Sequence, residues 1–320
     1  MKKKYYLLKT YFVHKLYGMK LTLIVLLTLP SYIFSQSLNT ERINKIKNAT
    51  VRVIVYDGSS VGTGFFINSK GDIATCWHVI QPALTPLGVK TIFIQLNNED
   101  TMSVTIDTAL INSIKPYQKA IGYDYCILKP TRVLKNKITY LKLGNFDNIL
   151  EGQEVYTCGY PFGFSNQFIS KGIVSSKYIE KGNWVQVNGD TAKLPRHQAL
   201  LDLTLNKGNS GGPIIKIGKS SDNDEVIGIA DFIINPVSLI SDSVKDELNN
   251  LRLLEGNVKM NVLTDATGKE ITSNDPNKID TQLFDMIQNT SNGISGCISI
   301  NHLIEALKKN EKEDNVKNLK

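Results

Sequence analysis

The stretch Leu205-Asn206-Lys207-Gly208-Asn209-Ser210-Gly211-Gly212-Pro213-Ile214-Ile215 places one serine among three glycines, ahead of an apolar run typical of a β-strand. Glycine has no Cβ, so it permits tight turns and lets backbone amides approach a reacting centre. A serine hydroxyl becomes a nucleophile when a base takes its proton and N–H groups face the oxyanion that forms. We therefore expect Ser210 to be a catalytic nucleophile, with the amides of Gly208 and Ser210 forming an oxyanion hole. The alternative is a glycine-rich turn that holds a solvent-exposed serine.

A nucleophilic serine needs a base, and the chain offers four histidines: His14, His78, His197 and His302. An imidazole titrates near neutral pH, so it can accept the serine proton and return it to the leaving group. His78 ends an apolar, strand-like run, and we expect it to be the base. We expect His197 in a surface loop and His302 near the start of the last helix. The alternative for His78 is a buried histidine of the core.

The base in turn needs a carboxylate that fixes its tautomer and stabilises the imidazolium. Asp124 directly precedes the apolar run Tyr125–Lys129, so it can be buried at the start of a strand. We expect Asp124 to orient His78, which completes the chain order His, Asp, Ser. The alternative is a turn or capping aspartate.

The first 35 residues predict an export signal. They contain six of the lysines and no acid, so the net charge of +7 falls to +1 without them. The apolar run Leu21–Phe34 is shorter than the roughly 20 residues of a spanning helix, and it ends at the small residue Ser35. We expect a cleaved signal over residues 1–35 and a periplasmic or secreted protein, or a membrane-anchored one if the signal is retained. The nearly neutral remainder gives no support for nucleic-acid binding.

The whole chain of 320 residues is 42% hydrophobic, and it is long enough for a sizeable core. Short strand-like runs separated by turns predict an all-β barrel or sandwich architecture. The expected strands are 51–56, 62–68, 73–77, 91–96, 103–111, 125–129, 153–160, 168–179, 184–187, 198–204, 213–217, 225–234 and 293–300. Short helices are expected at 38–47, 241–254 and 279–287, and a final helix starts at His302 before the charged tail 311–320.

The four cysteines, Cys76, Cys126, Cys158 and Cys297, lie within apolar runs, which favours buried free thiols, although a disulfide stays open. No Cys-x-x-Cys or His/Cys spacing indicates zinc. We expect neither a metal nor a cofactor.

The blocks GTGFFINSKGDIATCWHVI (62–80), DYCILK (124–129), YPFGFSNQFISKGIVSS (160–176) and LDLTLNKGNSGGPII (201–215) resemble the signature blocks of trypsin-like serine proteases, closest to the HtrA/Deg type. EVIGIADF (225–232) and GISGCISINHLIEAL (293–307) resemble that family's last two strands and terminal helix. The resemblance implies two six-stranded antiparallel β-barrels with His78, Asp124 and Ser210 between them. The protease domain would span 36–310, with barrels at about 50–145 and 150–300.

The chain departs from this pattern in three ways. HtrA/Deg proteins usually carry C-terminal PDZ domains, and none is expected here. Residues 236–292 form an insertion between the last two strands, expected to act as a lid or substrate-selecting element, or to be a surface decoration. Asp231 stands where the family usually has a small polar residue near the triad carboxylate; it either adds a second negative charge there or points away.

The resemblance also suggests a substrate pocket lined by Thr204, Leu205, Gly293 and Ser295. None of these residues is acidic, so we expect a small or medium apolar substrate side chain rather than lysine or arginine. The sequence therefore predicts a serine endopeptidase acting on protein or peptide substrates through an acyl-enzyme, with no membrane contact after signal cleavage. The alternative is a non-catalytic chaperone or peptide-binding protein on the same fold. The oligomeric state is left open.

Overall fold

The computed structural model describes residues 38–56, 58, 60–97, 100–134, 137–233, 263–264, 270–271 and 294–317. The chain divides into two units, Met1–Leu38 and Asn39–Lys320, and every described helix and strand belongs to the second. The expected export signal lies outside the described residues. So does nearly all of the insertion 236–292, including both helices expected there.

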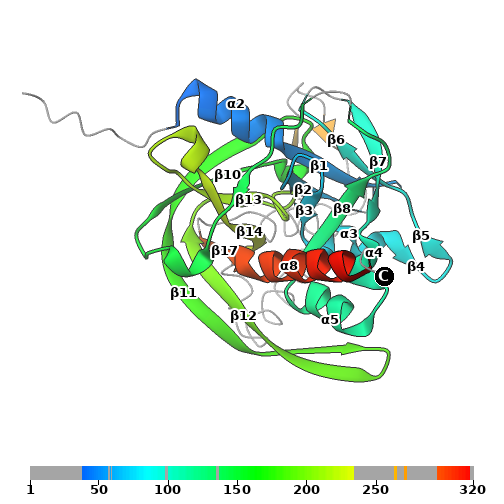
Figure 1. Cartoon of the computed structure of the whole chain (residues 1–320). Coiled ribbons are helices and arrows are strands. Elements are labelled where there is room, and N and C mark those ends of the chain that lie inside the picture. Colours follow the sequence, from blue (N-terminus) through cyan, green and yellow to red (C-terminus); the bar gives the residue numbers. More distant parts are fainter. Residues whose placement is uncertain are drawn as a thin grey trace, which may run out of the picture. The chain divides into compact units, whose positions relative to one another are not determined.

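Six strands form a closed barrel in the order β1-β2-β3-β8-β7-β6, drawn in blue to cyan-green in Figure 1. Along β1 the valines Val51, Val53 and Val55 are buried, whereas Arg52 and Ile54 between them are partly exposed, as the two-residue period of a strand requires. The expected first barrel is confirmed. Its strands are β1 Thr50–Val55, β2 Val61–Phe66, β3 Ile73–Thr75, β6 Ile92–Gln95, β7 Thr101–Ile106 and β8 Cys126–Pro130.

The second sheet has seven strands in the order β13-β10-β11-β12-β17-β14-β9, and β13 also pairs with β14. The resemblance implied a second six-stranded antiparallel barrel here, whereas the structure has a seven-stranded sheet. The seventh, β9, runs parallel to β14 for two residues, where the chain crosses from the first barrel to the second sheet. An apolar cluster that includes Val155, Val174, Leu201, Ile214 and Ile227 fills its core. The strands are β9 Lys142–Leu143, β10 Glu154–Gly159, β11 Phe168–Val187, β12 Asp190–Asp202, β13 Pro213–Lys216, β14 Glu225–Ile233 and β17 Ile294–Ser299.

Strands β11 and β12 form one long hairpin, where the sequence predicted three shorter strands and a loop containing His197. The two-residue turn is Asn188-Gly189, and both residues have positive φ, +50° and +86°. That conformation suits the right-handed twist of a hairpin and favours Asn-Gly. The hairpin contacts α5 (Ile114–Gly122), where Gln118 donates a hydrogen bond of 2.9 Å to the Asp190 carbonyl.

The helices lie before the first strand, in connections between strands, and after the last strand. The predicted N-terminal helix is confirmed with slightly different bounds, and the predicted C-terminal helix is confirmed but continues to Lys317, through most of the expected charged tail. The short helices between β7 and β8 were not predicted, because Asp107 caps a helix within the run expected to be a strand. The helices are α2 Thr40–Ala49, α3 Trp77–Ile80, α4 Thr108–Ile111, α5 and α8 Ile300–Lys317, with 3-10 turns at η1 Gln81–Ala83, η2 Phe146–Asn148, η3 Pro161–Gly163 and η4 Ser221–Asn223. Two small ladders pair β4 Leu84–Thr85 with β5 Gly88–Val89, and β15 Leu263–Thr264 with β16 Glu270–Ile271.

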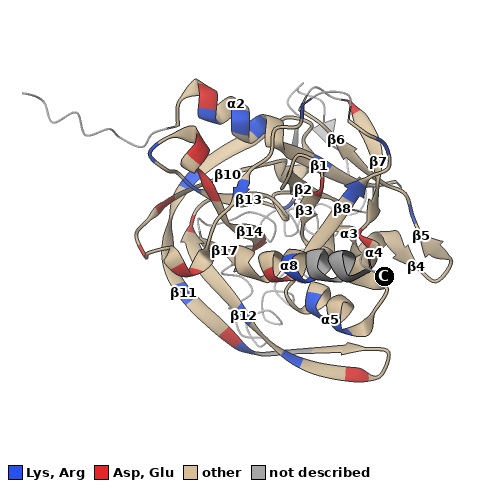
Figure 2. Cartoon of the chain, viewed as in Figure 1, with Lys and Arg blue, Asp and Glu red and all other residues tan. Residues whose placement is uncertain are grey.

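Several sequence expectations concern general properties of the chain. All four cysteines are buried and free, as favoured above. Figure 2 shows basic and acidic segments interspersed over the described elements. Within the residues that the structure describes, no helix is long and apolar enough to cross a membrane.

A buried ion pair attaches α2 to the second sheet. The Arg42 side chain, 6% exposed, lies 3.6 Å from the Asp224 carboxylate and donates a 2.7 Å hydrogen bond to the Gly218 carbonyl. Lys45, one turn along the same helix, makes a comparable but more exposed pair with Asp222 at 3.5 Å. The two pairs allow a direct comparison of burial.

We predict that Arg42→Met lowers the free energy of unfolding by about 3 kcal/mol, because it leaves a buried carboxylate without its counter-charge. The matched variant Lys45→Met is expected to cost less than about 1 kcal/mol, because its pair is exposed to solvent. Urea denaturation measures both. Equal losses for the two variants would show that the buried pair does not anchor the helix.

Candidate active site

Ser210 lies in the tight turn that joins β12 to β13. Gly208 and Gly211 have φ of +100° and +86°, which only glycine adopts without strain. A Cβ on Gly208 would lie 2.3 Å from the Tyr160 carbonyl oxygen, and one on Gly211 would lie 2.1 Å from the Thr63 carbonyl oxygen. The glycines therefore allow the turn to pack directly against neighbouring backbone.

Thr63 of β2 fastens this turn to the first barrel. Its buried hydroxyl donates to the Gly208 carbonyl (2.7 Å) and accepts from the Tyr160 N–H (3.1 Å). Its own N–H donates to the Ser210 carbonyl at 2.8 Å, and its carbonyl accepts from the Thr75 hydroxyl at 2.7 Å. One residue of the first barrel thus holds both ends of the segment Gly208–Ser210. Sequence reasoning missed this role, although Thr63 lies in the quoted block GTGFF.

Two backbone N–H groups of the turn, those of Gly208 and Ser210, are available to an incoming group. The Lys207 carbonyl accepts from the Phe162 N–H (2.5 Å), and the Asn209 carbonyl accepts from the Gly212 N–H (2.9 Å). A trans peptide places its C=O and N–H on opposite sides, so the N–H groups of Gly208 and Ser210 face away from these partners. Within the described part of the chain, neither N–H has a hydrogen-bond acceptor.

His78 and Asp124 are in direct contact. His78 lies in the short helix α3, not at the end of a strand as expected, because the chain turns after β3. The Asp124 carboxylate accepts from the His78 backbone N–H (2.9 Å), and its second oxygen lies 2.6 Å from Nδ1 of the ring. Asp124 has φ of +50°, in the left-handed region that Asp tolerates, between α5 and β8. Because Nδ1 faces this carboxylate, Nε2 is the ring nitrogen left to accept a proton.

The Ser210 hydroxyl donates to the Asp231 backbone carbonyl at 3.4 Å. Among the described residues it has no hydrogen bond to His78. Apo sites often hold such contacts long or misaligned before a substrate is bound.

Electrostatics distinguish the two members of the His–Asp pair. Burial disfavours the His78 imidazolium, but the hydrogen bond and charge of Asp124 outweigh it, so the pKa of His78 is raised. Burial likewise disfavours the Asp124 carboxylate, but hydrogen bonds from His78 and Asp231 hold its pKa well below the usual range. Asp124 is therefore ionised across the physiological range.

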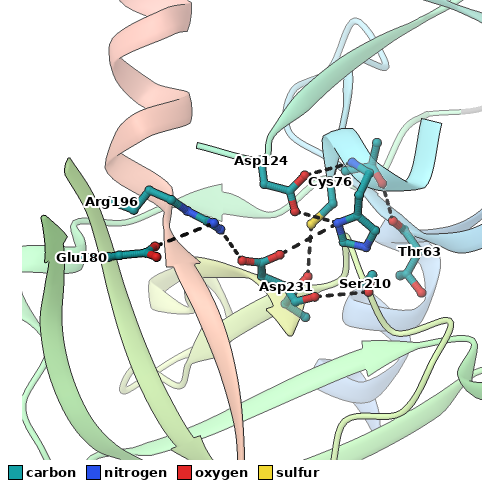
Figure 3. A network of polar contacts seen from close by, with 10 residues as sticks. Thr63, Cys76, Asp124, Glu180, Arg196, Ser210 and Asp231 are labelled. Carbon is teal, nitrogen blue, oxygen red and sulfur yellow. Dashed lines mark hydrogen bonds and ion pairs between the residues drawn. The ribbon is translucent and has the colours of Figure 1, made fainter. Parts of the chain in front are cut away.

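Asp231 faces the site rather than pointing away, which settles the alternative left open by the sequence. One of its carboxyl oxygens lies 3.9 Å from His78 Nδ1, and the other forms an ion pair with Arg196 of β12 (Figure 3). Arg196 also lies 3.9 Å from Glu180 of β11. Sequence reasoning gave no role to Arg196, which lies in a polar stretch without a motif.

The other described histidines pair with each other. His302 of α8 accepts a 3.1 Å hydrogen bond from the His197 backbone N–H through Nε2 and stacks on Tyr123 with ring centroids 3.9 Å apart. Burial first, and then nearby positive groups, lower the pKa of His302 to about 3. His302 is therefore a neutral, structural histidine, and His197 lies in a strand instead of a surface loop.

The expected pocket residues differ in accessibility. Thr204 is exposed, but Leu205 is 2% exposed within the apolar core. Ser295 is fully buried, and its hydroxyl donates to the Leu203 carbonyl at 2.7 Å. Gly293 lies outside the described residues.

Within the described residues, one group brings metal-binding side chains together: Cys76, His78, Asp124 and Asp231, with donor atoms within 4.8 Å of one another. Each already has a partner in the protein, since the Cys76 thiol donates to the Ala230 carbonyl at 3.2 Å and the Arg196 guanidinium contacts the Asp231 carboxyl group. These contacts account for the group without a metal.

Comparison with known proteins agrees with this geometry. The sequence profile of the family described as "Trypsin-like peptidase domain" matches residues 62–229, which is more than half of the chain. The chain belongs to the trypsin-like peptidase family. The match contains all three residues of the expected triad, so the resemblance inferred from the sequence blocks is confirmed at the level of the family.

Relatives of this trypsin-like peptidase include longer proteases. It is 30% identical over 177 residues to a periplasmic DegP-like serine endoprotease of Pseudomonas fulva (54% of this chain, 29% of that protein). It is 28% identical over 170 residues to the mouse serine protease HTRA3 (53% and 32%). The chain thus spans about a third or less of these relatives' length. Among solved structures, the HtrA-type protease AlgW with a tripeptide is 18% identical with a TM-score of 0.48, covering 83% of this chain and 61% of AlgW.

We predict that Thr63→Val lowers the free energy of unfolding by at least about 2 kcal/mol. Valine keeps the shape but leaves the Gly208 carbonyl and the Tyr160 N–H buried without partners, each worth about 1–3 kcal/mol. Thr63→Ser keeps the hydroxyl and is expected to lose less than about 1.5 kcal/mol. Urea denaturation compares them; a valine variant as stable as the serine variant would contradict the role given to the hydroxyl.

Proposed function

We propose that this protein is a serine endopeptidase in which Ser210 is the nucleophile, His78 the general base and acid, and Asp124 the carboxylate that orients His78. The observation that carries the proposal is the double contact of Asp124 with His78, at 2.6 and 2.9 Å. The serine turn of the same chain has two N–H groups, of Gly208 and Ser210, without an acceptor among the described residues. The alternative, a non-catalytic binding protein, has no need of this constellation.

In the proposed reaction, Nε2 of His78 takes the Ser210 proton as Oγ attacks the substrate carbonyl carbon. Asp124 stabilises the imidazolium that forms. Collapse of the tetrahedral intermediate breaks the C–N bond, and His78 gives its proton to the leaving amine. Water then attacks the acyl-enzyme with His78 again as base, which releases the acid product and restores Ser210.

The amides of Gly208 and Ser210 would form the oxyanion hole. The hydrogen bonds to the carbonyls of Lys207 and Asn209 fix the orientation of these two peptide groups. No reorganisation of the peptides is then needed when the oxyanion develops. Loss of one such donor typically costs about 100- to 1,000-fold in kcat.

The proposed substrate is a protein or peptide with a small or medium apolar side chain before the scissile bond. Of the described residues assigned to the pocket, the exposed Thr204 carries no charge, whereas Leu205 lies in the core and the buried Ser295 hydroxyl is engaged by Leu203. We also propose that the protein is exported, on the basis of its lysine-rich, apolar N-terminus and of its periplasmic DegP-like relative.

Labelling by a fluorophosphonate probe tests the proposed activity. We predict that the folded wild-type protein is labelled at Ser210, that Ser210→Ala is not labelled, and that His78→Ala reacts at least about a thousandfold more slowly, because the base is lost. His197→Gln is the matched histidine control and is expected to react at the wild-type rate.

Circular dichroism is the control that tests whether each variant is folded. A folded wild-type protein that takes up no label and cleaves no unfolded protein substrate would favour the non-catalytic alternative.

A further inference from the structure

Asp231 brings a second carboxyl group into contact with the His–Asp pair. Its side chain is 9% exposed, lies 3.9 Å from His78 Nδ1, and has a carboxyl oxygen within 4.8 Å of that of Asp124 (Figure 3). A small polar residue at this position would carry no charge. In this chain, two carboxyl groups lie beside the His78 imidazole.

Two buried carboxyl groups with oxygens within 4.8 Å of each other repel when both are ionised, which favours a proton on one of them. Asp124 already accepts two hydrogen bonds from His78 and is the stronger acid. Burial first, and then the hydrogen bond and charge of Asp124, raise the pKa of Asp231 to about 8, although Arg196 and His78 oppose the shift. Asp231 is therefore the carboxyl group of the two that binds a proton, and it ionises in the same pH range in which His78 titrates.

Arg196 lowers the cost of burying the Asp231 carboxyl group, because its positive charge lies beside it. It pairs with Asp231 from the middle of β12, and its cross-strand partner is Glu180 of β11. The long β11–β12 hairpin thus reaches the active site through one guanidinium group. The other titratable groups whose charges act with that of Asp231 come from the elements around it: Cys76 before α3, Tyr178 of β11 and Cys297 of β17.

We propose that Asp231 is a positioning residue of the active site: held by Arg196, it donates its proton to Asp124 in the neutral form and adds a second negative charge beside His78 when it ionises. The neutral form fixes the Asp124 carboxylate toward His78. The ionised form stabilises the imidazolium. In either form, Asp231 acts on the reaction through its neighbours and does not touch the substrate in order to do so.

The first test measures His78 directly, without any need for activity. In the Ser210→Ala background, NMR of the histidine rings gives the pH midpoint of His78 with and without Asp231→Asn. Removing a carboxylate that can ionise is expected to move this midpoint to lower pH. Asp222→Asn removes an exposed carboxylate elsewhere and is expected to leave it unchanged. An unmoved midpoint, or one moved to higher pH, in Asp231→Asn would overturn the proposal.

The second test rests on the proposed function and uses the rate of fluorophosphonate labelling. Asp231→Ala removes the hydrogen bond to Asp124 and is expected to slow labelling about tenfold at pH 7. Asp231→Asn can still donate a hydrogen bond and is expected to recover most of this rate, with the acid limb of its pH profile displaced to lower pH. Equal rates for the two variants would contradict the positioning role.

The part given to Arg196 is tested by a double-mutant cycle. Arg196→Gln is expected to slow labelling in the wild-type background but to have little further effect beside Asp231→Asn, because it acts through Asp231. If Arg196→Gln lowers the labelling rate by the same factor in both backgrounds, Arg196 does not act through Asp231. If the wild-type protein takes up no label at all, the proposed function fails, while the NMR result still decides the proposal about Asp231.

Discussion

The hydroxyl group of Thr63 is the contact on which the site depends. It belongs to the first barrel, yet it satisfies the Gly208 carbonyl of the nucleophile turn and the Tyr160 N–H that follows β10, both in the second half of the chain. A buried polar group without a partner is costly, so the turn and the barrel are fixed in one relative position. The glycines on both sides of Ser210 are what allow backbone to approach backbone this closely. The proposed chemistry therefore requires both halves of the fold to be assembled.

Short local patterns carried most of what the sequence could predict. Ser210 among its glycines, the apolar run ending in His78, and Asp124 ahead of β8 are each visible within a few residues. The first barrel followed from alternating apolar positions such as those of β1. The sequence predicted the β11–β12 hairpin as separate shorter strands, because polar stretches at 180–183 and 195–198 interrupt its apolar alternation. Its turn signal, Asn188-Gly189, was present in the sequence and was not used.

The direction of Asp231 could not be read from periodicity, and the ladder explains why. The pairing of β14 with β17 shifts register between Ala230 and Phe232, so Asp231 sits at a bulge. A bulge interrupts the alternation of faces and re-aims the side chain at that residue. Arg196 was equally hidden, because it becomes significant only when strands far apart in sequence meet. The electrostatic character of the site is thus a property of the tertiary structure.

The reactivity of the four buried thiols reports whether the protein is folded. Cys76, Cys126, Cys158 and Cys297 belong to different segments, two of them in strands of the second sheet and one in the first barrel. Burial raises the pKa of Cys158 and Cys297 to about 12 and holds those of Cys76 and Cys126 far above the ordinary range, so almost no thiolate exists in the folded protein. Thiolate is the reactive form of cysteine. Oxidants and alkylating agents therefore act on these four cysteines only while the protein is opening or has not yet folded.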